Sequence, residues 1–304
     1  MNKITIIEQD VIFLSYDEPN AEKNYADLLT KLPWAKRVHG VKGSDAAHKA
    51  CAAKSDTEYF VTVDADNIVD PKFFEQIIDI PTGALAFSWP GVNVINGLQY
   101  GNGSLKVWRK DFVLGMKTHE AAEEDKGQVD FCWEAGYYPL TVSYSETIIN
   151  STPLQAWRAG FREGVKMCLN RGAKPTVVEF QQRVHQRNLD HLTIWHNVGS
   201  DAEHGYWAIA GARQGTYMTM LTEWDHKQVQ WFDALAELWE TVKDSDPRLL
   251  AGRLAEDLNT QLDLPMAILE AEQSAFFKHH YRSNWQNQGV MVREIDVIRK
   301  QEGW

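Results

Sequence analysis

The order of apolar runs in the first 66 residues constrains the fold more than any other feature of this sequence. Three short apolar runs are typical of buried strands, and two segments between them repeat apolar residues at helical spacing. The strands are expected at residues 11–16, 37–41 and 59–63, and the helices at 21–31 and 46–54. Strands that alternate with helices form a largely parallel sheet. We therefore predict an α/β fold whose mostly parallel sheet carries helices on both faces.

The remainder of the chain is expected to begin with strands and to end in helices. Further strands are predicted at 85–89 and 104–108, and the segment 96–103 between them is rich in Gly and Asn and predicts a mobile loop. Helical spacing returns at 156–170, 228–242 and 263–277. This pattern predicts a helical C-terminal region.

Length and charge narrow the class of protein. A chain of 304 residues can hold one large α/β domain with a helical appendage. Its net charge of -11 argues against nucleic-acid binding through the surface as a whole, although a local basic patch is compatible with phosphate binding. The three cysteines lack metal-binding spacing and are typical of reduced thiols, and no apolar run is long enough to cross a membrane. We expect a cytoplasmic protein with no membrane partner.

Two pairs of carboxylates stand where a ligand is expected. Asp64 and Asp66 directly follow the third predicted strand, and Asp17 and Glu18 follow the first. Ligands of open α/β sheets bind beyond the carboxyl ends of the strands, so both pairs should face one pocket. Carboxylate oxygens suit Mn²⁺ and Mg²⁺, which also leave coordination sites for phosphates. The apolar strand before Asp64 favours a metal site over the alternative of a solvated turn.

Three pieces of this region resemble the nucleotide-binding half of the family 2-like glycosyltransferases, which have the GT-A fold. The pieces are VIFLSYDEPN, GSDAAHKACA and DTEYFVTVDADN, and they occur in the family's order and spacing. One departure is His48-Lys49, where the family often has Arg-Asn. The resemblance implies a GT-A-like nucleotide-sugar-binding and catalytic domain over residues 1–220 and a helical C-terminal region over 221–304.

The same resemblance implies an activity: the metal-dependent transfer of a sugar from a nucleotide-sugar donor, with a UDP-sugar favoured, to a hydroxyl group, with Mn²⁺ or Mg²⁺ as cofactor. It assigns Asp17 or Glu18 to the base or ribose, Asp45 to the base edge, Lys49 to the phosphates, Asp64 to the ribose or the metal, and Asp66 to the metal. Two alternatives stay open. A metal-dependent nucleotidyltransferase usually has a Gly-rich phosphate loop after the first strand, and the acidic turn here disfavours it. The other is a non-catalytic nucleic-acid or carbohydrate-binding protein.

The acceptor side is predicted from two segments. Residues 129–139, VDFCWEAGYYP, are similar to the family's acidic acceptor-side stretch, which implies Asp130 as general base, with Glu134 as the alternative. The glycine content of residues 96–108 is typical of a lid, and Tyr100 and Trp108 could stack there on a sugar or a base. Core packing is the structural alternative for both aromatic residues.

A basic segment stands out in this acidic chain. Arg158, Arg162 and Lys166 recur every four residues, so one helix face carries three cations. Arg158 and Arg162 are predicted to contact the donor diphosphate. Arg171 and Lys174 lie beyond this face and are predicted to contact the acceptor. The alternative is a solvated face that pairs with the acidic C-terminal helices.

Two further predictions concern the C-terminal half. Gly160 and Gly164 share the four-residue spacing and would let another backbone approach the helix closely. His191, His196 and His204 are candidates for a third metal ligand, because GT-A enzymes often supply one from this side of the chain, and His196 is preferred.

A looser resemblance bears on the acceptor. The segments LSYDEPN, PWAKRVHGVKG and AWRAGFREGVK resemble the glycosyltransferases of large tailed bacteriophages. This resemblance implies addition of a sugar to hydroxymethylated pyrimidines of phage DNA in the host cytoplasm, by an enzyme that unstacks its target base. The basic segment agrees with DNA as acceptor, and the overall acidity does not. A protein or glycan hydroxyl is the alternative acceptor.

Overall fold

The chain divides into two compact units. The computed structural model describes residues 2–117, 135–284 and 295. The first unit comprises residues 1–93 and 99–148, and the second comprises 94–98 and 149–304. Judged by which residues pack together, the boundary between the units falls after residue 148, and the helices before residue 220 pack in the same unit as the helices after it. The functional division at residue 220 stays a prediction.

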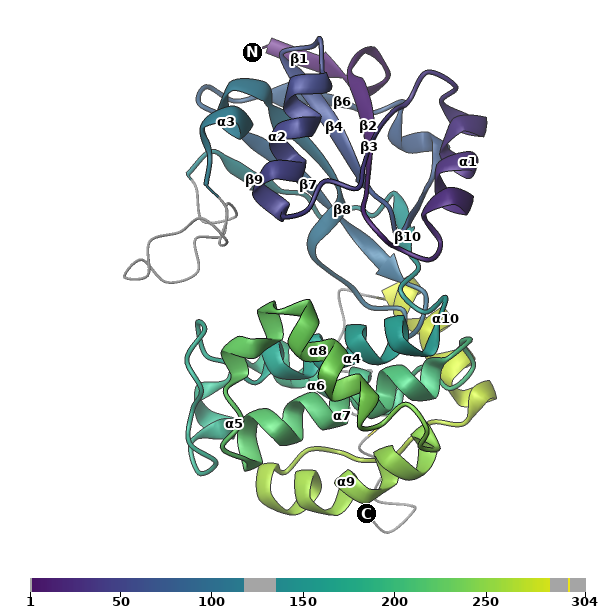
Figure 1. Cartoon of the computed structure of the whole chain (residues 1–304), viewed down its shortest axis with the longest axis vertical. Helices are drawn as coiled ribbons and strands as arrows, with labels where there is room; N and C mark the ends of the chain where they lie inside the picture. The colour runs from purple at the N-terminus through teal and green to yellow at the C-terminus, as the bar shows by residue number, and fades with distance from the viewer. Residues whose placement is uncertain (1, 118–134, 285–294, 296–304) are drawn as a thin grey trace. The chain divides into compact units, whose positions relative to one another are not determined.

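The first unit is built on a mixed sheet (Figure 1). Its strands are β2 (Asp10–Ser15), β3 (Lys36–His39), β4 (Tyr59–Asp64), β5 (Asn67–Val69), β7 (Ala86–Asn93), β8 (Gln99–Arg109), β9 (Tyr137–Pro139) and β10 (Ser145–Thr147). They lie in the order β3-β2-β4-β8-β7-β10-β5, and β9 also pairs with β7. Of these strands, β5 and β8 run opposite to the rest of the described sheet. A separate ribbon pairs β1 (Asn2–Thr5) with β6 (Ile77–Ile80).

The predicted α/β class is confirmed. β2 pairs in parallel with β3 and β4, as the alternation of strands and helices predicts. The loop predicted at 96–103 is shorter than expected, because β8 already begins at Gln99. A short connection between two neighbouring strands makes them antiparallel, and β7 and β8 pair in this way.

Helices cover both faces of this sheet. The helices are α1 (Ala21–Lys31), α2 (Ser44–Lys54) and α3 (Lys110–Gly115). Alternate residues of β2 point to opposite faces. Phe13 belongs to the apolar cluster that includes Leu28 of α1, whereas Ile12 belongs to the cluster that includes Cys51 of α2. Because β2 and β4 run parallel, their carboxyl ends lie at the same edge of the sheet.

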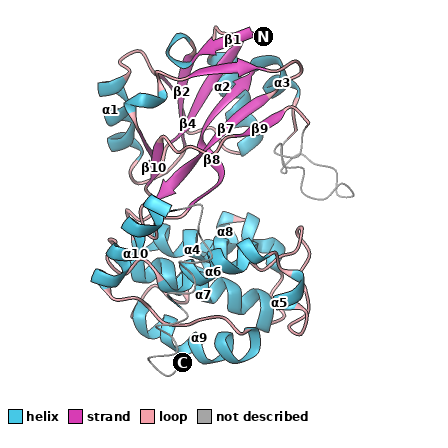
Figure 2. Ribbon diagram, turned by 180° about the vertical axis from the view of Figure 1, so that it is seen from behind, coloured by secondary structure: helices cyan, strands magenta, loops and turns pink. Residues whose placement is uncertain are grey.

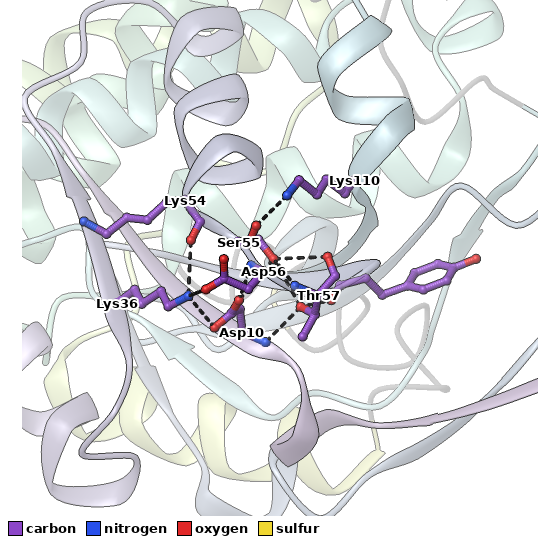
Figure 3. A network of polar contacts seen from close by, with 8 residues as sticks. Asp10, Lys36, Lys54, Ser55, Asp56, Thr57 and Lys110 are labelled. Atoms are coloured by element: carbon purple, nitrogen blue, oxygen red, sulfur yellow. Dashed lines mark hydrogen bonds and ion pairs between the residues drawn. The ribbon is translucent and has the colours of Figure 1, made fainter.

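A polar network ties together the opposite edge of the sheet, where β2 and β4 begin (Figure 3). Asp10 accepts hydrogen bonds from the backbone amide of Asp56 at 2.5 Å and from the hydroxyl of Ser55 at 3.3 Å. Lys36 forms ion pairs with Asp10 and Asp56, each at 2.8 Å. Burial raises the pKa of Asp10, but the hydrogen bonds from Lys36 and Asp56 outweigh it, and the net pKa lies below its usual value.

Asp10→Asn is expected to lower the free energy of unfolding by about 1–2 kcal/mol at pH 7, because a charge-assisted network is lost. A carboxyl with a lowered native pKa stabilises the fold above its unfolded pKa, and that stability is lost as the pH falls through the native pKa. The difference between the variant and the unaltered protein should therefore shrink at pH 3. Urea unfolding at both pH values measures it, and an equal difference at both would contradict the role of the charge.

Among the described residues the second unit is helical, and the strands lie in the first unit (Figure 2). Its helices are α4 (Pro153–Met167), α5 (Phe180–Arg183), α6 (Gln186–Asn197), α7 (Gly205–Leu221), α8 (Phe232–Glu240), α9 (Pro247–Leu262) and α10 (Ala271–Asn284). The helix predicted at 263–277 is corrected, because α9 ends at Leu262 and α10 begins at Ala271. Pro265 disfavours a continuous helix, and its carbonyl accepts a hydrogen bond from the Asn197 amide at 2.8 Å. In the described residues, no helix is both long and apolar enough to cross a bilayer.

Glycines set the distance between α4 and α7. A Cβ atom at Gly160 would lie 1.9 Å from the carbonyl oxygen of Ala208, and one at Gly164 would lie 2.2 Å from that of Ala212. The contact is reciprocal, because a Cβ atom at Gly211 of α7 would lie 2.1 Å from the carbonyl oxygen of Trp157. The predicted close approach of another backbone at Gly160 and Gly164 is confirmed.

Candidate active site

The two aspartates of the predicted metal site lie on an anchored turn. Asp64 ends β4, and Asp66 stands in the turn before β5. The Asn67 amide donates to Asp66 Oδ1 at 2.5 Å, and its own Oδ1 accepts from the Thr147 hydroxyl at 3.0 Å. The backbone amide of Ile148 donates to the carbonyl oxygen of Asp66 at 2.6 Å. Contacts from the end of β10 therefore hold the turn.

A second anchor comes from the face covered by α1. Asn24 of α1 is buried, and its amide donates to the carbonyl oxygen of Ala65 at 2.8 Å. Ala65, between the two aspartates, is itself buried in the apolar cluster of that face. The turn that carries both carboxyl groups is thus held from α1 and from β10.

Three carboxyl groups crowd this edge of the sheet. Glu18 follows β2, and its carboxylate accepts a hydrogen bond from the backbone amide of Tyr16 at 2.8 Å. Burial, and then the charges of Asp64 and Glu18, raise the pKa of the half-buried Asp66 to about 7. The residues predicted from two separate strands therefore interact electrostatically. A cation bound at Asp66 would relieve this repulsion.

One residue of the site was missed by the sequence analysis. Lys106 of β8 is only 6% exposed, and its ammonium lies 3.0 Å from Asp64 Oδ2. Antiparallel pairing sets Lys106 opposite Thr62, two residues before Asp64. The available signal was a single lysine inside the apolar run SLKVW, where a buried cation needs a counter-charge.

The N-terminal part of α2 brings together two more predicted residues. Lys49 forms an ion pair with Asp45 at 2.6 Å, and both side chains keep some exposure. The buried His48 donates from Nδ1 to the carbonyl oxygen of Ser44 at 2.8 Å, which fixes its tautomer. Burial, and then the charge of Lys106, lower the pKa of His48, so its ring is neutral at pH 7. Asp17 is exposed next to Glu18.

The donor set fits a hard divalent cation that is shared with a ligand. In the described part of the chain, no cluster of three or more His, Cys, Asp or Glu side chains could hold a metal by itself. Asp64 and Asp66 would supply carboxylate oxygens, and water or phosphate oxygens would complete the shell, as Mg²⁺ sites on nucleotides commonly do. The crowding of Asp66 by like charges is the structural observation that favours a cation there.

Two predicted site residues are buried in the protein interior. Trp108 has no exposed surface, and its indole donates to the Thr62 hydroxyl at 2.9 Å, so it offers no face to an acceptor in this structure. His196 is also fully buried, with Nε2 2.9 Å from the Thr216 hydroxyl. Burial, and then the charge of Arg213, lower its pKa to about 3. We assign both residues to core packing, and the metal-binding role of Asp64 and Asp66 stays a prediction.

The remaining predicted residues lie elsewhere. Tyr100 is half-buried on β8. The guanidinium groups of Arg158 and Arg162 lie 4.7 and 5.1 Å from the ring centroid of the exposed Phe232, in the helical unit. In the same unit Arg171 is exposed, and the exposed Lys174 donates to the carbonyl oxygen of Thr222 at 3.1 Å. Asp130 and Glu134 lie outside the described residues.

The fold and the site define an α/β protein with a carboxylate cluster at the carboxyl edge of its sheet. Neither a protein-family model nor a curated protein matches the sequence. Several solved structures align with part of the chain. One is a glycosyltransferase involved in the glycosylation of the major capsid of PBCV-1, with 13% identity, a TM-score of 0.29, and 44% of this chain and 81% of that chain covered. Another is HddC from Yersinia pseudotuberculosis, with 13% identity, a TM-score of 0.27, and 44% of this chain and 71% of that chain covered. Similarities at this level do not indicate an activity.

Proposed function

We propose that this chain is a metal-dependent glycosyltransferase that takes its sugar from a nucleotide-sugar donor, with a UDP-sugar favoured. The observation that carries the proposal is the placement of Asp64, Asp66 and Glu18 at or after the carboxyl ends of the parallel strands β4 and β2, where burial and the charges of Asp64 and Glu18 raise the pKa of Asp66. A divalent cation bound at these carboxylates would offset their negative charge and could at the same time bind the phosphates of a nucleotide. The resemblance of the segments around β2, α2 and β4 to the family 2-like glycosyltransferases supports the choice of donor.

The residues predicted from sequence for the donor and the reaction have the following roles in this proposal. A divalent cation, Mn²⁺ or Mg²⁺, held by Asp64 and Asp66 would neutralise the nucleoside diphosphate that leaves. Asp17 or Glu18, at the end of β2, would bind the ribose or base, and Asp45 the base edge. Lys49 would exchange its ion pair with Asp45 for a phosphate. Asp130 is proposed as the general base that deprotonates the acceptor hydroxyl, with Glu134 as the alternative.

The acceptor in this proposal carries a hydroxyl group. Hydroxymethylated pyrimidine in DNA is one candidate, which rests on the resemblance to glycosyltransferases of large tailed bacteriophages. The exposed side chains of Arg171 and Lys174 are then the residues expected to contact the DNA backbone. A protein or glycan hydroxyl is the other candidate. Stimulation of donor consumption by modified DNA, compared with unmodified DNA, distinguishes them.

The test of the proposed function is a screen for nucleoside diphosphate release. The protein with Mn²⁺ is expected to hydrolyse at least one nucleotide sugar slowly without acceptor, and excess EDTA is expected to abolish release because the leaving diphosphate loses its counter-charge. Restoring Mn²⁺ after EDTA is the control. No release from any donor would contradict the proposed activity, and full release in EDTA would contradict its metal dependence.

A further inference from the structure

A buried lysine, Lys106, is paired with Asp64, one of the two predicted metal ligands. Lysine side chains are rarely buried, because removing an ammonium group from water is costly unless a counter-charge is close. Lys106 lies between Leu105 and Val107, both of which are fully buried, and its ammonium lies 3.0 Å from Asp64 Oδ2. The lysine therefore neutralises the charge of Asp64 and engages one of the two carboxylate oxygens that a metal ion could use.

Strand pairing on both sides fixes the backbone position of Lys106. Its strand is paired on one side with β4 and on the other with β7, where Lys106 lies opposite Ser88. The His48 ring close by is neutral at pH 7, so it contributes no counter-charge. The net charge around Asp64 thus depends on Lys106, the neighbouring carboxylates and whatever ligand binds.

We propose that Lys106 makes binding of the divalent cation conditional on binding of a nucleoside diphosphate. In the free protein the Lys106 ammonium competes with the cation for Asp64. A bound diphosphate adds negative charge and phosphate oxygens, so the ammonium gains a second partner and the cation gains ligands. This inference rests on the proposed function, since it takes a nucleoside diphosphate as the second ligand.

The two ligands are then thermodynamically coupled. If the diphosphate raises the affinity for the cation by some factor, the cation raises the affinity for the diphosphate by the same factor. Removing the charge of Lys106 should strengthen cation binding in the absence of nucleotide and reduce this coupling factor. Lys106 acts in this scheme as a positioning residue for Asp64 and as a contact to phosphate.

The experiment measures Mn²⁺ affinity by electron paramagnetic resonance of free Mn²⁺, with and without UDP. For the unaltered protein we expect weak binding without UDP and at least about tenfold tighter binding with it, a coupling of ordinary size. For Lys106→Met we expect Mn²⁺ binding without UDP to be about tenfold tighter, because a nearby positive charge is gone. The coupling factor should fall correspondingly. Lys106→Arg keeps the charge and should keep the coupling.

Lys36→Met is the matched control, because Lys36 is a partly buried lysine paired with aspartates at the opposite edge of the same sheet. It should leave Mn²⁺ affinity and coupling unchanged, and circular dichroism checks that each variant is folded. Equal Mn²⁺ affinity and equal coupling in Lys106→Met and the unaltered protein overturn the inference. If donor release by the unaltered protein persists in that case, the proposed function still stands. The expected Mn²⁺ shift without any donor release would instead support the role of Lys106 and count against the activity.

Discussion

Asp66→Asn is expected to abolish sugar transfer and, in the metal-free protein, to stabilise the fold above neutral pH. Loss of one carboxylate ligand should lower the rate of diphosphate release about 10³-fold or more, because a charge contact in a partly buried site is worth on the order of 4 kcal/mol. The effect on stability has the opposite sign. Burial, with the charges of Asp64 and Glu18, raises the pKa of Asp66 to about 7.

The pH dependence follows from that raised pKa. Between the unfolded pKa, near 4, and pH 7 the folded protein binds a proton that the unfolded chain has lost, so its stability falls as the pH rises through this window. The asparagine side chain of the variant carries no charge to desolvate. The gain in free energy of unfolding should be on the order of 2 kcal/mol at pH 8, with an upper bound of about 4 kcal/mol, and it should vanish below pH 4.

Urea unfolding in EDTA at pH 4 and pH 8 measures this effect, and the donor-release assay measures activity. Asp70→Asn is the control, because Asp70 is exposed and caps a short helical turn through the amide of Lys72, which asparagine can also do. The control should change neither stability nor activity. An Asp66→Asn variant that is inactive and also destabilised at pH 8 would mean that Asp66 is a structural carboxylate.

Gly160→Ala is expected to disrupt the helical unit, although it adds a single methyl group. The new Cβ atom would lie 1.9 Å from the carbonyl oxygen of Ala208, a backbone atom that cannot rotate away. Relief requires α4 and α7 to separate, which breaks the packing along the whole contact. We expect a loss of about 3 kcal/mol or more in the free energy of unfolding. The melting temperature should fall by roughly 10 °C, followed by circular dichroism at 222 nm.

Gly252→Ala is the matched control for this prediction. Gly252 lies within α9, and apart from its chain neighbours and its own helix backbone a Cβ atom there would have no atom within 4 Å. Alanine has the higher helix propensity, so this variant should gain up to about 1 kcal/mol. The same substitution is thus expected to act with opposite signs at the two positions. A Gly160→Ala protein that melts like the unaltered one would refute the assigned packing of α4 on α7.

The region from β2 to β4 could be predicted from sequence because its determinants are local. The helix predicted at 21–31 has the bounds of α1, and the third predicted strand differs from β4 by one residue. Apolar periodicity and the acidic turns that end the strands suffice for this region. The gathering of Glu18, Asp64 and Asp66 then follows from the parallel pairing of β2 with β4.

Residues whose role depends on distant pairing could not be predicted in this way. Lys106 meets Asp64 because β8 pairs with β4 in one antiparallel register, and the two residues are 42 positions apart in the chain. Trp108 and His196 are side chains that suit binding sites and cores equally well, and their partners Thr62 and Thr216 are far along the chain or on another helix. Helical spacing at 263–277 likewise cannot show that Asn197 holds Pro265.

The short connection between β7 and β8 has a consequence for any dissection of this protein. Residues 94–98 belong to the helical unit although they join two strands of the sheet, so the polypeptide passes between the units after residues 93, 98 and 148. Ile95 and Leu98 are fully buried, and the carbonyl oxygen of Val94 accepts from Lys278 at 3.2 Å, across 184 positions. A truncation at residue 148 would remove the rest of their unit and expose the side chains of Ile95 and Leu98 to water. During synthesis on the ribosome, residues 94–98 likewise cannot complete their packing until α10 has been made, because their unit includes that helix.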